Sequence, residues 1–373
     1  MPNIGHAYLF AWRFARYIPE PLLRGIANLA ADIAWHKQGK GVKRLESNYG
    51  KIRPDLSEKE IRHLSKAGMR SYLQYYQQAF TLPAATKSQL NARVRAVGLK
   101  NVTEPLKNGT GVIAVLGHYG NWDLAGAWVA ANVAPLLTVA EKLEPPKLYE
   151  EFLSFRRGLG MEVLGLGDKG VFGKLAEGLA APNVIALVAD RDLTSRGVEV
   201  TLCGQQARVA AGPAALALDT GAPIVPVLIS FERLRGAARR AAKTPWGIVL
   251  EFCTPIYPPS KNETHFVRVE DNLPSYPGAP KRRQRWVETP VSRPEQIKTL
   301  TQKWITVVGE FLQKHPEDWH MLQRVFLADL DPIRLPSVPA PTPVILRKAP
   351  SAAVAESSPN AAPGFCDFAQ NDG

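Results

Sequence analysis

The sequence predicts an α/β protein with a mixed, largely parallel β-sheet flanked by helices. Short apolar runs rich in β-branched residues, such as GVIAVLG at 111–117, are typical of buried strands. Segments with helical periodicity lie between these runs, and such alternation favours a parallel sheet covered on both faces. The chain has 373 residues, of which 45% are hydrophobic and 21% charged, a composition typical of a folded globular protein.

From about residue 94 onward, the expected strands and helices follow one another along the chain. The expected strands are 111–117, 135–143, 161–166, 183–190, 198–204, 223–232 and 247–253. The expected helices are 121–133, 147–160, 171–180, 212–221 and 294–314.

The N-terminal part is expected to be a helical, membrane-associating segment over residues 1–90. It opens with AYLFAWRFARYI at 7–18, and a helix over 25–45 ends in a basic cluster of Lys37, Lys40, Lys43 and Arg44. An aromatic and basic amphipathic stretch can lie in a lipid interface. The alternative is an ordinary packing helix with a solvated basic face.

Three further boundaries divide the rest of the chain. An α/β domain is expected over 91–330, interrupted by a basic loop insertion at 258–294 that lacks clear periodicity. Its KRRQR run either meets phosphates or is a solvated loop. The Pro- and Ala-rich segment 331–373 is expected to be a disordered tail.

Net charge and cysteine content restrict the partners. The formal charge of +12 and the pI near 9.6 indicate an anionic partner. No nucleic-acid-binding signature occurs, and no apolar run reaches the roughly eighteen residues of a membrane span. We therefore expect a peripheral protein on the anionic, cytoplasmic side of the cell membrane. The three cysteines lack C-x-x-C spacing, which argues against disulfides or a zinc site.

One short motif, GHYGNWD at 117–123, has the residues needed for acid–base chemistry. His118 is followed five residues later by Asp123, but His265 and Glu270 have the same spacing, so spacing alone carries little weight. The context carries more, because His118 follows a buried strand, where open α/β sheets place their ligands. Asn121 is expected to cap the next helix, with Asp123 in its first turn folding back onto the imidazole.

Such a pair is the base and the orienting carboxylate of an acid–base system. The sequence contains no G-x-S-x-G motif, so no nucleophile elbow is indicated. We therefore expect His118 to activate a hydroxyl group of a substrate, with oxyanion donors near Gly117–Gly120. The alternative is a structural histidine at a strand end.

Several blocks together resemble one enzyme family. GHYGNWD resembles the H-x₄-D/E motif of the lysophospholipid and lipid A acyltransferase superfamily. HPEDWHMLQR is similar to the C-terminal signature of one branch, the actinobacterial phosphatidylinositol mannoside acyltransferases. The other similar blocks are 17–48, 189–193, 197–204 and 210–227, with Leu202 and Cys203 in place of the usual aromatic pair.

The resemblance implies a reaction. His118 would deprotonate a mannose hydroxyl, the 6-hydroxyl of the mannose on inositol C2 of a phosphatidylinositol mannoside, which attacks a long-chain acyl-CoA. Asp123 would orient the base, and Glu199 would aid the base or the acceptor. Acyl-CoA is then a donor substrate, and no cofactor or metal is expected; His315 and His320 in HPEDWH lack further histidine or cysteine ligands nearby.

Four more residues are assigned to substrate binding on the same resemblance: Glu141, Arg156, Asp190 and Arg191. A guanidinium beside the crevice suits the phosphates of coenzyme A or an inositol phosphate. Arg156 is otherwise a solvated helix end. Asp190 and Arg191, with Asp192, are otherwise an ion-pair knot at a strand end.

Three other functions remain open from the sequence. A lipid A-type enzyme that transfers lauroyl or myristoyl chains to a Kdo-lipid has an acceptor that is also a lipid-linked sugar. A basic peripheral membrane-binding protein without catalysis would not need His118. A thioesterase would hydrolyse the acyl thioester without any acceptor.

Overall fold

The computed structural model describes residues 15–142, 146–192, 194, 196–259, 264–270 and 284–330. All of them belong to one compact unit, Met1–Leu335. Most of the expected helix at 7–18, part of the insertion at 258–294 and the expected tail at 331–373 lie outside the described residues.

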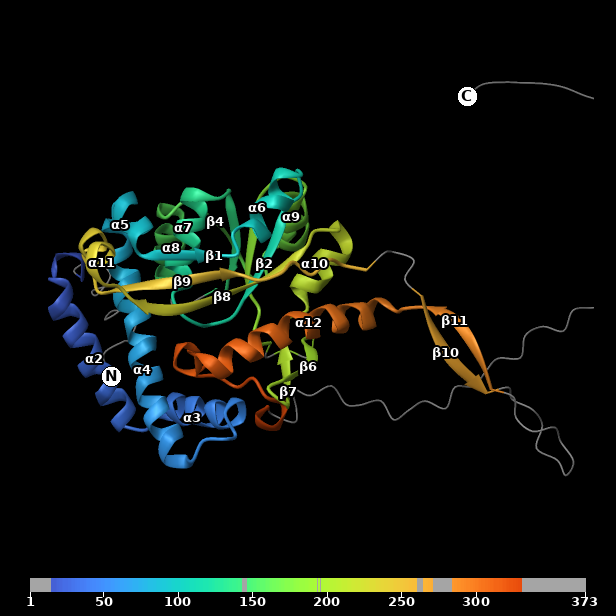
Figure 1. Cartoon of the computed structure of the whole chain (residues 1–373), viewed down its shortest axis with the longest axis horizontal. Helices are drawn as coiled ribbons and strands as arrows, with labels where there is room; N and C mark the ends of the chain where they lie inside the picture. The colour runs from blue at the N-terminus through green and yellow to red at the C-terminus, as the bar shows by residue number, and fades with distance from the viewer. Residues whose placement is uncertain are drawn as a thin grey trace, which may run out of the picture. The chain divides into compact units, whose positions relative to one another are not determined.

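A seven-stranded sheet forms the centre of the unit (Figure 1), with the strand order β1-β9-β8-β2-β5-β3-β4. Only the β8–β9 pairing is antiparallel; the other neighbouring strands in this sheet are parallel. The prediction of a mixed, largely parallel sheet is therefore confirmed. The strands are β1 (Val94–Val97), β2 (Val112–Leu116), β3 (Leu136–Ala140), β4 (Met161–Gly165), β5 (Val184–Val188), β8 (Ile224–Arg233) and β9 (Trp246–Phe252).

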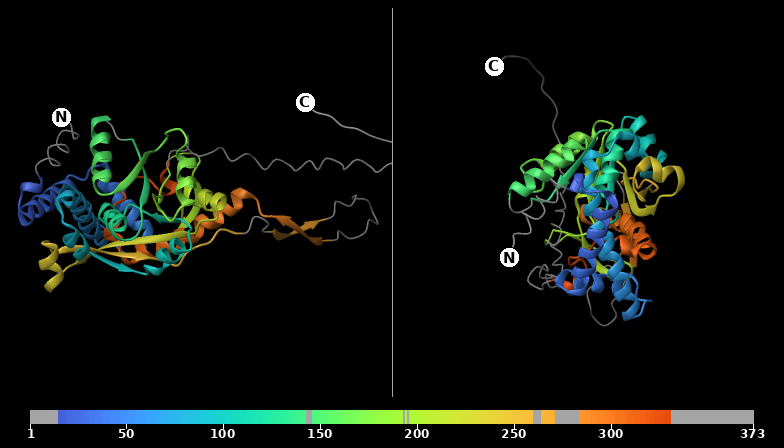
Figure 2. Two further views of the ribbon diagram at one scale, coloured as in Figure 1. Left: turned by 90° about the horizontal axis from the view of Figure 1, so that it is seen from above. Right: turned by 90° about the vertical axis from the view of Figure 1, so that its left-hand side faces the viewer.

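Helices cover the sheet on both faces, as the two views of Figure 2 show. Right-handed crossovers explain this division, because the chain moves outward from β2 through β3 to β4 and then returns through β5 to β8. These helices are α6 (Lys100–Lys107), α7 (Trp122–Asn132), α8 (Pro146–Gly158), α9 (Val171–Leu179), α10 (Gly212–Thr220) and α12 (Arg293–Lys314), whereas the short α11 (Gly236–Ala242) connects β8 to β9. Every residue of β2 is buried, so the strand preceding His118 is fixed within the core.

The N-terminal region is built of separate helices. They are α2 (Glu20–His36), α3 (Lys40–Ile52), α4 (Glu58–Thr81) and α5 (Lys87–Ala92), with short 3₁₀ turns at Ala15–Tyr17 and Leu82–Ala84. The single helix expected over 25–45 is wrong, because the chain turns at Gln38, whose φ of 48° lies in the left-handed region. Helix α4 begins at a capping box of Ser57 and Glu60.

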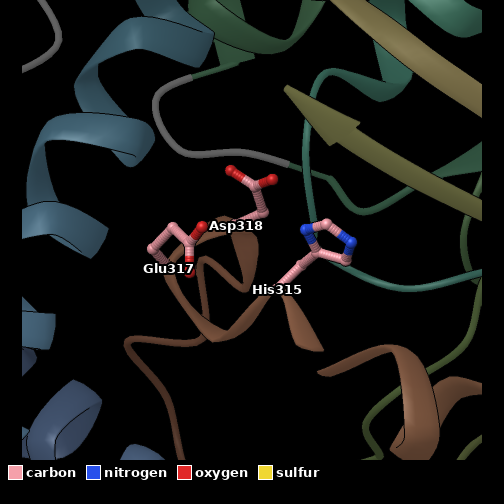
Figure 3. A group of neighbouring side chains, drawn as sticks. All are labelled: His315, Glu317 and Asp318. Carbon is pink, nitrogen blue, oxygen red and sulfur yellow. The ribbon is translucent and has the colours of Figure 1, made fainter. Parts of the chain in front are cut away.

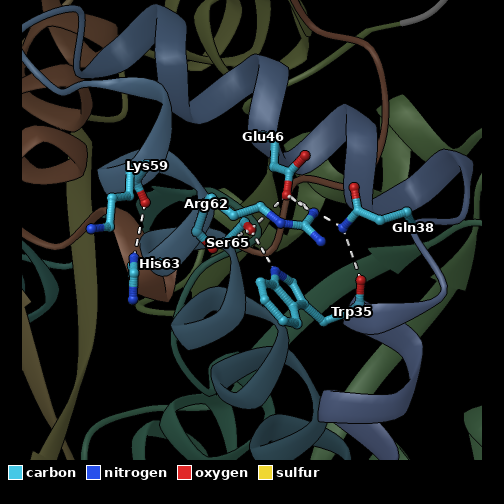
Figure 4. A network of polar contacts seen from close by, with 7 residues as sticks. All are labelled: Trp35, Gln38, Glu46, Lys59, Arg62, His63 and Ser65. Atoms are coloured by element: carbon cyan, nitrogen blue, oxygen red, sulfur yellow. Dashed lines mark hydrogen bonds and ion pairs between the residues drawn. The ribbon is translucent and has the colours of Figure 1, made fainter.

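A polar network joins α2, α3 and α4 (Figure 4). The Trp35 indole donates to Ser65 Oγ at 2.8 Å, and Ser65 Oγ donates to Glu46 Oε1 at 2.9 Å. Arg62 pairs with Glu46 at 2.6 Å and stacks over the Trp35 ring at 4.2 Å. These contacts set the orientation of α4, the helix that reaches the site.

Two antiparallel hairpins lie outside the main sheet. One consists of β6 (Val198–Leu202) and β7 (Gln205–Val209), and helix α12 packs against β6. The other consists of β10 (Thr264–Glu270) and β11 (Gln284–Pro290), within the range expected to be a loop. The run FVRV inside β10 has the alternation and β-branched content of a strand. Among the described residues, no helix is both long and apolar enough to cross a bilayer.

Candidate active site

Two neighbouring parallel strands bring His118 and Asp190 together. Strands β2 and β5 pair in register up to Leu116 and Val188, and each of the two residues lies two positions beyond its strand. The Nδ1–H of His118 donates to Asp190 Oδ1 at 2.6 Å, and its backbone N–H donates to Oδ2 at 2.9 Å. The pair lies at the carboxyl edge of the sheet, where α/β proteins place their ligands.

The charge on Asp190 fixes the tautomer of the histidine. The Asp190 carboxyl group is 1% exposed, and burial alone would raise its pKa. The His118 imidazole and the hydrogen bonds that Asp190 accepts outweigh burial, so the pKa of Asp190 lies below 3.8. Asp190 is then ionised at neutral pH and accepts a hydrogen bond from Nδ1–H, which leaves the lone pair on Nε2. The His118 side chain is 28% exposed, and no described residue forms a hydrogen bond with Nε2.

Asp123 does not hold His118, and the contact expected between them is wrong. Asn121 does cap α7 by accepting from the Leu124 N–H at 2.9 Å, as predicted, and Asp123 lies in the first turn. On this helix, however, the Asp123 carboxylate faces α4 and α8. It accepts from the Tyr75 hydroxyl at 2.6 Å and from Arg156 Nε at 2.7 Å.

Arg156 is the buried counter-charge of Asp123. Its side chain is 9% exposed and its guanidinium lies 4.3 Å from the centre of the Phe152 ring. Burial would lower the pKa of Arg156, but the Asp123 carboxylate raises it, so the charge is kept. Arg156 is therefore not a solvated helix end, and its pairing with Asp123 replaces the expected phosphate contact.

The remaining predicted site residues form two further ion pairs. Arg191, directly after Asp190, lies with Nη2 3.3 Å from Glu141 Oε2, at the ends of the neighbouring strands β5 and β3. Glu199 faces Arg208 across the β6–β7 hairpin at 2.9 Å, and the Glu199 carboxylate is about half exposed. Within the described residues, no hydrogen bond joins either pair to His118. Asp190 itself holds His118, which places it in the role expected of Asp123.

The loop around His118 tolerates only glycine at two positions. A side chain at Gly117 would lie 2.7 Å from Asp190 Oδ2, and one at Gly120, where φ is +60°, would collide with the Ile229 carbonyl. The N–H groups of His118, Tyr119 and Gly120 all donate within the protein. The expectation that this loop supplies oxyanion donors is therefore not supported at these three amides.

Sequence reasoning missed the C-terminal block as part of the site. Trp319 Nε1 donates to Asp190 Oδ2 at 3.0 Å, and the His320 N–H donates to the His118 carbonyl at 2.7 Å. Trp319 and Tyr119 also form a β-bridge. The available signal was that GHYGNWD and HPEDWH both contain histidine and tryptophan. Nothing in the sequence, however, shows that these two blocks come into contact.

Asp318 and His320 form a buried polar cluster with Ser71, beside this block. Ser71 Oγ lies 3.0 Å from Asp318 Oδ1 and 2.9 Å from His320 Nε2. Burial raises the pKa of Asp318 to about 7 and lowers that of His320 to about 3, the latter with a contribution from His118. Both side chains are therefore uncharged at mildly acidic pH.

His315, Glu317 and Asp318 lie around the turn Pro316–Asp318 (Figure 3). One ligand atom from each falls within 4.8 Å of the others, the spacing of a possible cation site. Both Asp318 oxygens are already hydrogen-bonded, one by Ser71 and the other by the Phe231 N–H at 3.0 Å. These bonds explain the position of the carboxyl group without a cation.

Comparison with known proteins shows the family of the chain. The family model described as bacterial lipid A biosynthesis acyltransferase matches residues 1–238. A protein of Mycolicibacterium smegmatis named phosphatidylinositol mannoside acyltransferase is 31% identical over 87% of this chain and 91% of its own length. A protein of Mycobacterium tuberculosis with the same name is 31% identical over 88% of this chain and 90% of its own. The chain belongs to the bacterial lipid A biosynthesis acyltransferase family.

Proposed function

We propose that this acyltransferase moves a long-chain, palmitoyl-like acyl group from acyl-CoA to a mannose hydroxyl of a phosphatidylinositol mannoside. The expected position is the 6-hydroxyl of the mannose on inositol C2. The observation that carries the proposal is the His118–Asp190 pair, 2.6 Å apart, with the histidine partly exposed. The acceptor is proposed from the names of the two relatives, each matched over most of its length.

In the proposed reaction, the sugar hydroxyl donates its proton to His118 Nε2 as its oxygen attacks the thioester carbonyl carbon. Asp190, hydrogen-bonded to Nδ1, stabilises the imidazolium that forms. The tetrahedral intermediate then collapses, the carbon–sulfur bond breaks, and the imidazolium returns its proton to the leaving thiolate. The products are the acylated glycolipid and free coenzyme A, so no cofactor takes part in these steps.

The other charged residues have proposed roles around this centre. Asp123 and Arg156 hold α7 and α8 together behind the loop. Glu141 and Arg191, at the neighbouring strand ends, are proposed to contact the phosphates of a substrate. Glu199 is proposed to bind the acceptor sugar, since its carboxylate is exposed and held by the buried Arg208.

The test is acyl transfer from labelled palmitoyl-CoA by wild-type protein and His118→Ala. We expect transfer to phosphatidylinositol mannoside and a loss of about 10²–10⁴-fold in rate in the variant with folding retained. His63→Ala is the matched control, because His63 is exposed on α4 and, within the described residues, its ring forms a hydrogen bond with the Lys59 carbonyl alone (Figure 4).

Other outcomes of this experiment reject the proposal. Transfer to a Kdo-lipid acceptor alone would favour the lipid A-type reaction. Hydrolysis of the thioester at the same His118-dependent rate with every acceptor would indicate a thioesterase. Full function in His118→Ala would leave a basic membrane-binding protein as the better explanation.

We also propose that the protein works as a peripheral protein on the cytoplasmic side of the cell membrane. Lys37, Lys40 and Lys43 are exposed around the α2–α3 turn, whereas Arg44 is half-buried and lies 3.4 Å from Asp329. Each exposed lysine near an anionic surface contributes about 1 kcal/mol. Replacing the three lysines with glutamate should therefore weaken binding to anionic vesicles at low salt. Unchanged binding would show that these lysines do not contribute to membrane binding.

A further inference from the structure

Trp319 is a fully buried residue that reaches the proposed catalytic pair from a distant part of the sequence. It follows α12 and the turn Pro316–Asp318, whereas Asp190 lies two residues after β5. Its indole Nε1 nevertheless lies 3.0 Å from Asp190 Oδ2. Hydrogen bonds to ionised groups are among the stronger ones in proteins, so this contact bears on the state of the carboxylate.

The carboxylate of Asp190 accepts three hydrogen bonds from the described residues. The His118 ring donates to Oδ1, and the His118 backbone and the Trp319 indole donate to Oδ2. Two of the three donors belong to the histidine itself. Trp319 is thus the donor that does not belong to the His118–Asp190 pair. Its hydrogen bond fixes the plane of the carboxylate, with Oδ1 directed at the imidazole.

Trp319 is itself held firmly against the His118 loop. Its backbone bridges Tyr119, and its carbonyl accepts from the buried Tyr49 hydroxyl at 3.0 Å. Its neighbours on both sides bond to the loop: the Gly120 N–H donates to the Asp318 carbonyl at 3.0 Å, and the His320 N–H donates to the His118 carbonyl. The indole and the histidine therefore keep a fixed relative position.

We infer that Trp319 is a positioning residue for acyl transfer, acting by holding the Asp190 carboxylate in the orientation in which it accepts the hydrogen bond from His118 Nδ1–H. This inference rests on the proposed function of His118. It assigns to the C-terminal block a part in the chemistry, in addition to its packing.

The first test compares Trp319→Phe with Trp304→Phe. Both tryptophans are fully buried, but the Trp304 indole nitrogen makes no hydrogen bond to the described residues. Both variants lose the same volume, and only Trp319→Phe removes a donor to the site. We expect kcat to fall about tenfold to a hundredfold in Trp319→Phe, with KM nearly unchanged, and little change in Trp304→Phe.

The pH profile separates positioning from packing. The Trp319 hydrogen bond is one of the interactions that lower the pKa of Asp190. Its removal should raise that pKa, so the midpoint of Asp190 protonation, followed by the NMR signal of its carboxyl carbon, should move to higher pH in Trp319→Phe. Trp304→Phe should leave this midpoint in place.

A double-mutant cycle gives the third readout. If Trp319 acts through Asp190, Trp319→Phe should cause no further loss when Asp190→Asn is already present. Full additivity, or equal losses in Trp319→Phe and Trp304→Phe, would overturn the inference. Should Trp319→Phe fail to fold, a tryptophan analogue with a benzothiophene ring at position 319 keeps the shape and lacks only the N–H.

One readout does not require turnover. The downfield proton NMR signal of the His118 Nδ1–H, identified by its absence in His118→Ala, should shift in Trp319→Phe and stay in place in Trp304→Phe. A shift without any His118-dependent acyl transfer would reject the proposed function and keep the structural role of Trp319. Unchanged signal together with His118-dependent transfer would reject only the inference about Trp319.

Discussion

The carboxyl edge of the sheet and the outer face of α2 depart from the usual distribution of residues in opposite ways. At the sheet edge, charged side chains are buried: Asp123, Arg156, Asp190 and Arg208. On α2, large apolar side chains are exposed along one stripe: Leu22, Ile26, Leu29 and Ile33. Buried charges and clustered exposed apolar residues are both unusual in soluble domains.

The two regions differ in how each departure is compensated. Every buried charge at the sheet edge has a partner within the described residues, so the protein itself pairs them. The α2 stripe has the i, i+4, i+7, i+11 spacing of one helix face, beside exposed lysines. The first region is complete within the chain, whereas the second suits an apolar surface with anionic charge. Mutations at the sheet edge should therefore affect acyl transfer and folding. Mutations on the outer face of α2 should affect only binding to the membrane.

The largest effect is expected for Asp190→Asn. An asparagine amide in this position no longer holds the Nδ1–H tautomer, so Nε2 ceases to be the free base. In a serine–histidine–aspartate triad, the same change of the aspartate that holds the histidine reduces kcat by about 10⁴-fold. We expect a loss of about 10³–10⁴-fold in acyl transfer here. The measurement is kcat with labelled palmitoyl-CoA at saturating acceptor, alongside thermal unfolding of the same preparation. Wild-type activity in a folded Asp190→Asn protein would remove Asp190 from the mechanism.

Asp123→Asn should instead act mainly on stability. It leaves the Arg156 guanidinium buried without its counter-charge, which typically costs about 3–5 kcal/mol. Urea denaturation measures the free energy of unfolding. The matched control is Asp32→Asn, because Asp32 also pairs with an arginine, accepting two hydrogen bonds from Arg70 on an exposed surface, where about 0–1 kcal/mol is expected. Equal losses in the two variants would show that burial of the Asp123 pair is unimportant.

The contrast between Asp190 and Asp123 also shows what the sequence could predict. The strands, the capping residue Asn121 and the position of His118 after β2 follow from local patterns. The partner of His118 does not, because Asp190 is 72 residues away and meets it only when β5 inserts between β2 and β3. Local spacing therefore indicates Asp123, the nearest carboxylate in the sequence, as the partner. Trp319 was missed for the same reason, since its contact depends on tertiary packing.

The Asp318–His320 cluster should show two opposing pH effects. Folded Asp318 keeps its proton up to a pKa of about 7, while the unfolded carboxyl loses it near 3.8, so Asp318 alone makes stability fall as pH rises between these values. Folded His320 stays neutral down to a pKa of about 3, while the unfolded imidazole is protonated below 6.5, so His320 alone makes stability fall as pH drops. Between about pH 4 and 6.5 the two effects cancel.

Single substitutions should expose each slope. Relative to wild type, Asp318→Asn should lose stability as pH falls from 6 to 4.5, and His320→Asn should gain it, each by about 1.4 kcal/mol per pH unit. The difference in urea-unfolding free energy between variant and wild type at the two pH values removes the contribution of other groups. Slopes of the same sign in both variants would show that the two side chains are not held uncharged together.

The smallest effect on the folded protein is expected on α2. Leu29→Asp replaces a side chain that is 62% exposed, so the free energy of unfolding should change by no more than about 0.5 kcal/mol. Its binding to anionic vesicles should nevertheless weaken by about tenfold or more, because a charge replaces an apolar group that would enter the lipid interface. Tyr257→Asp is the control, since Tyr257 is equally exposed at 62% but belongs to the segment after β9 and not to α2. Vesicle sedimentation with both variants decides the point: if Tyr257→Asp weakens binding as much as Leu29→Asp, added negative charge rather than the α2 stripe accounts for the change.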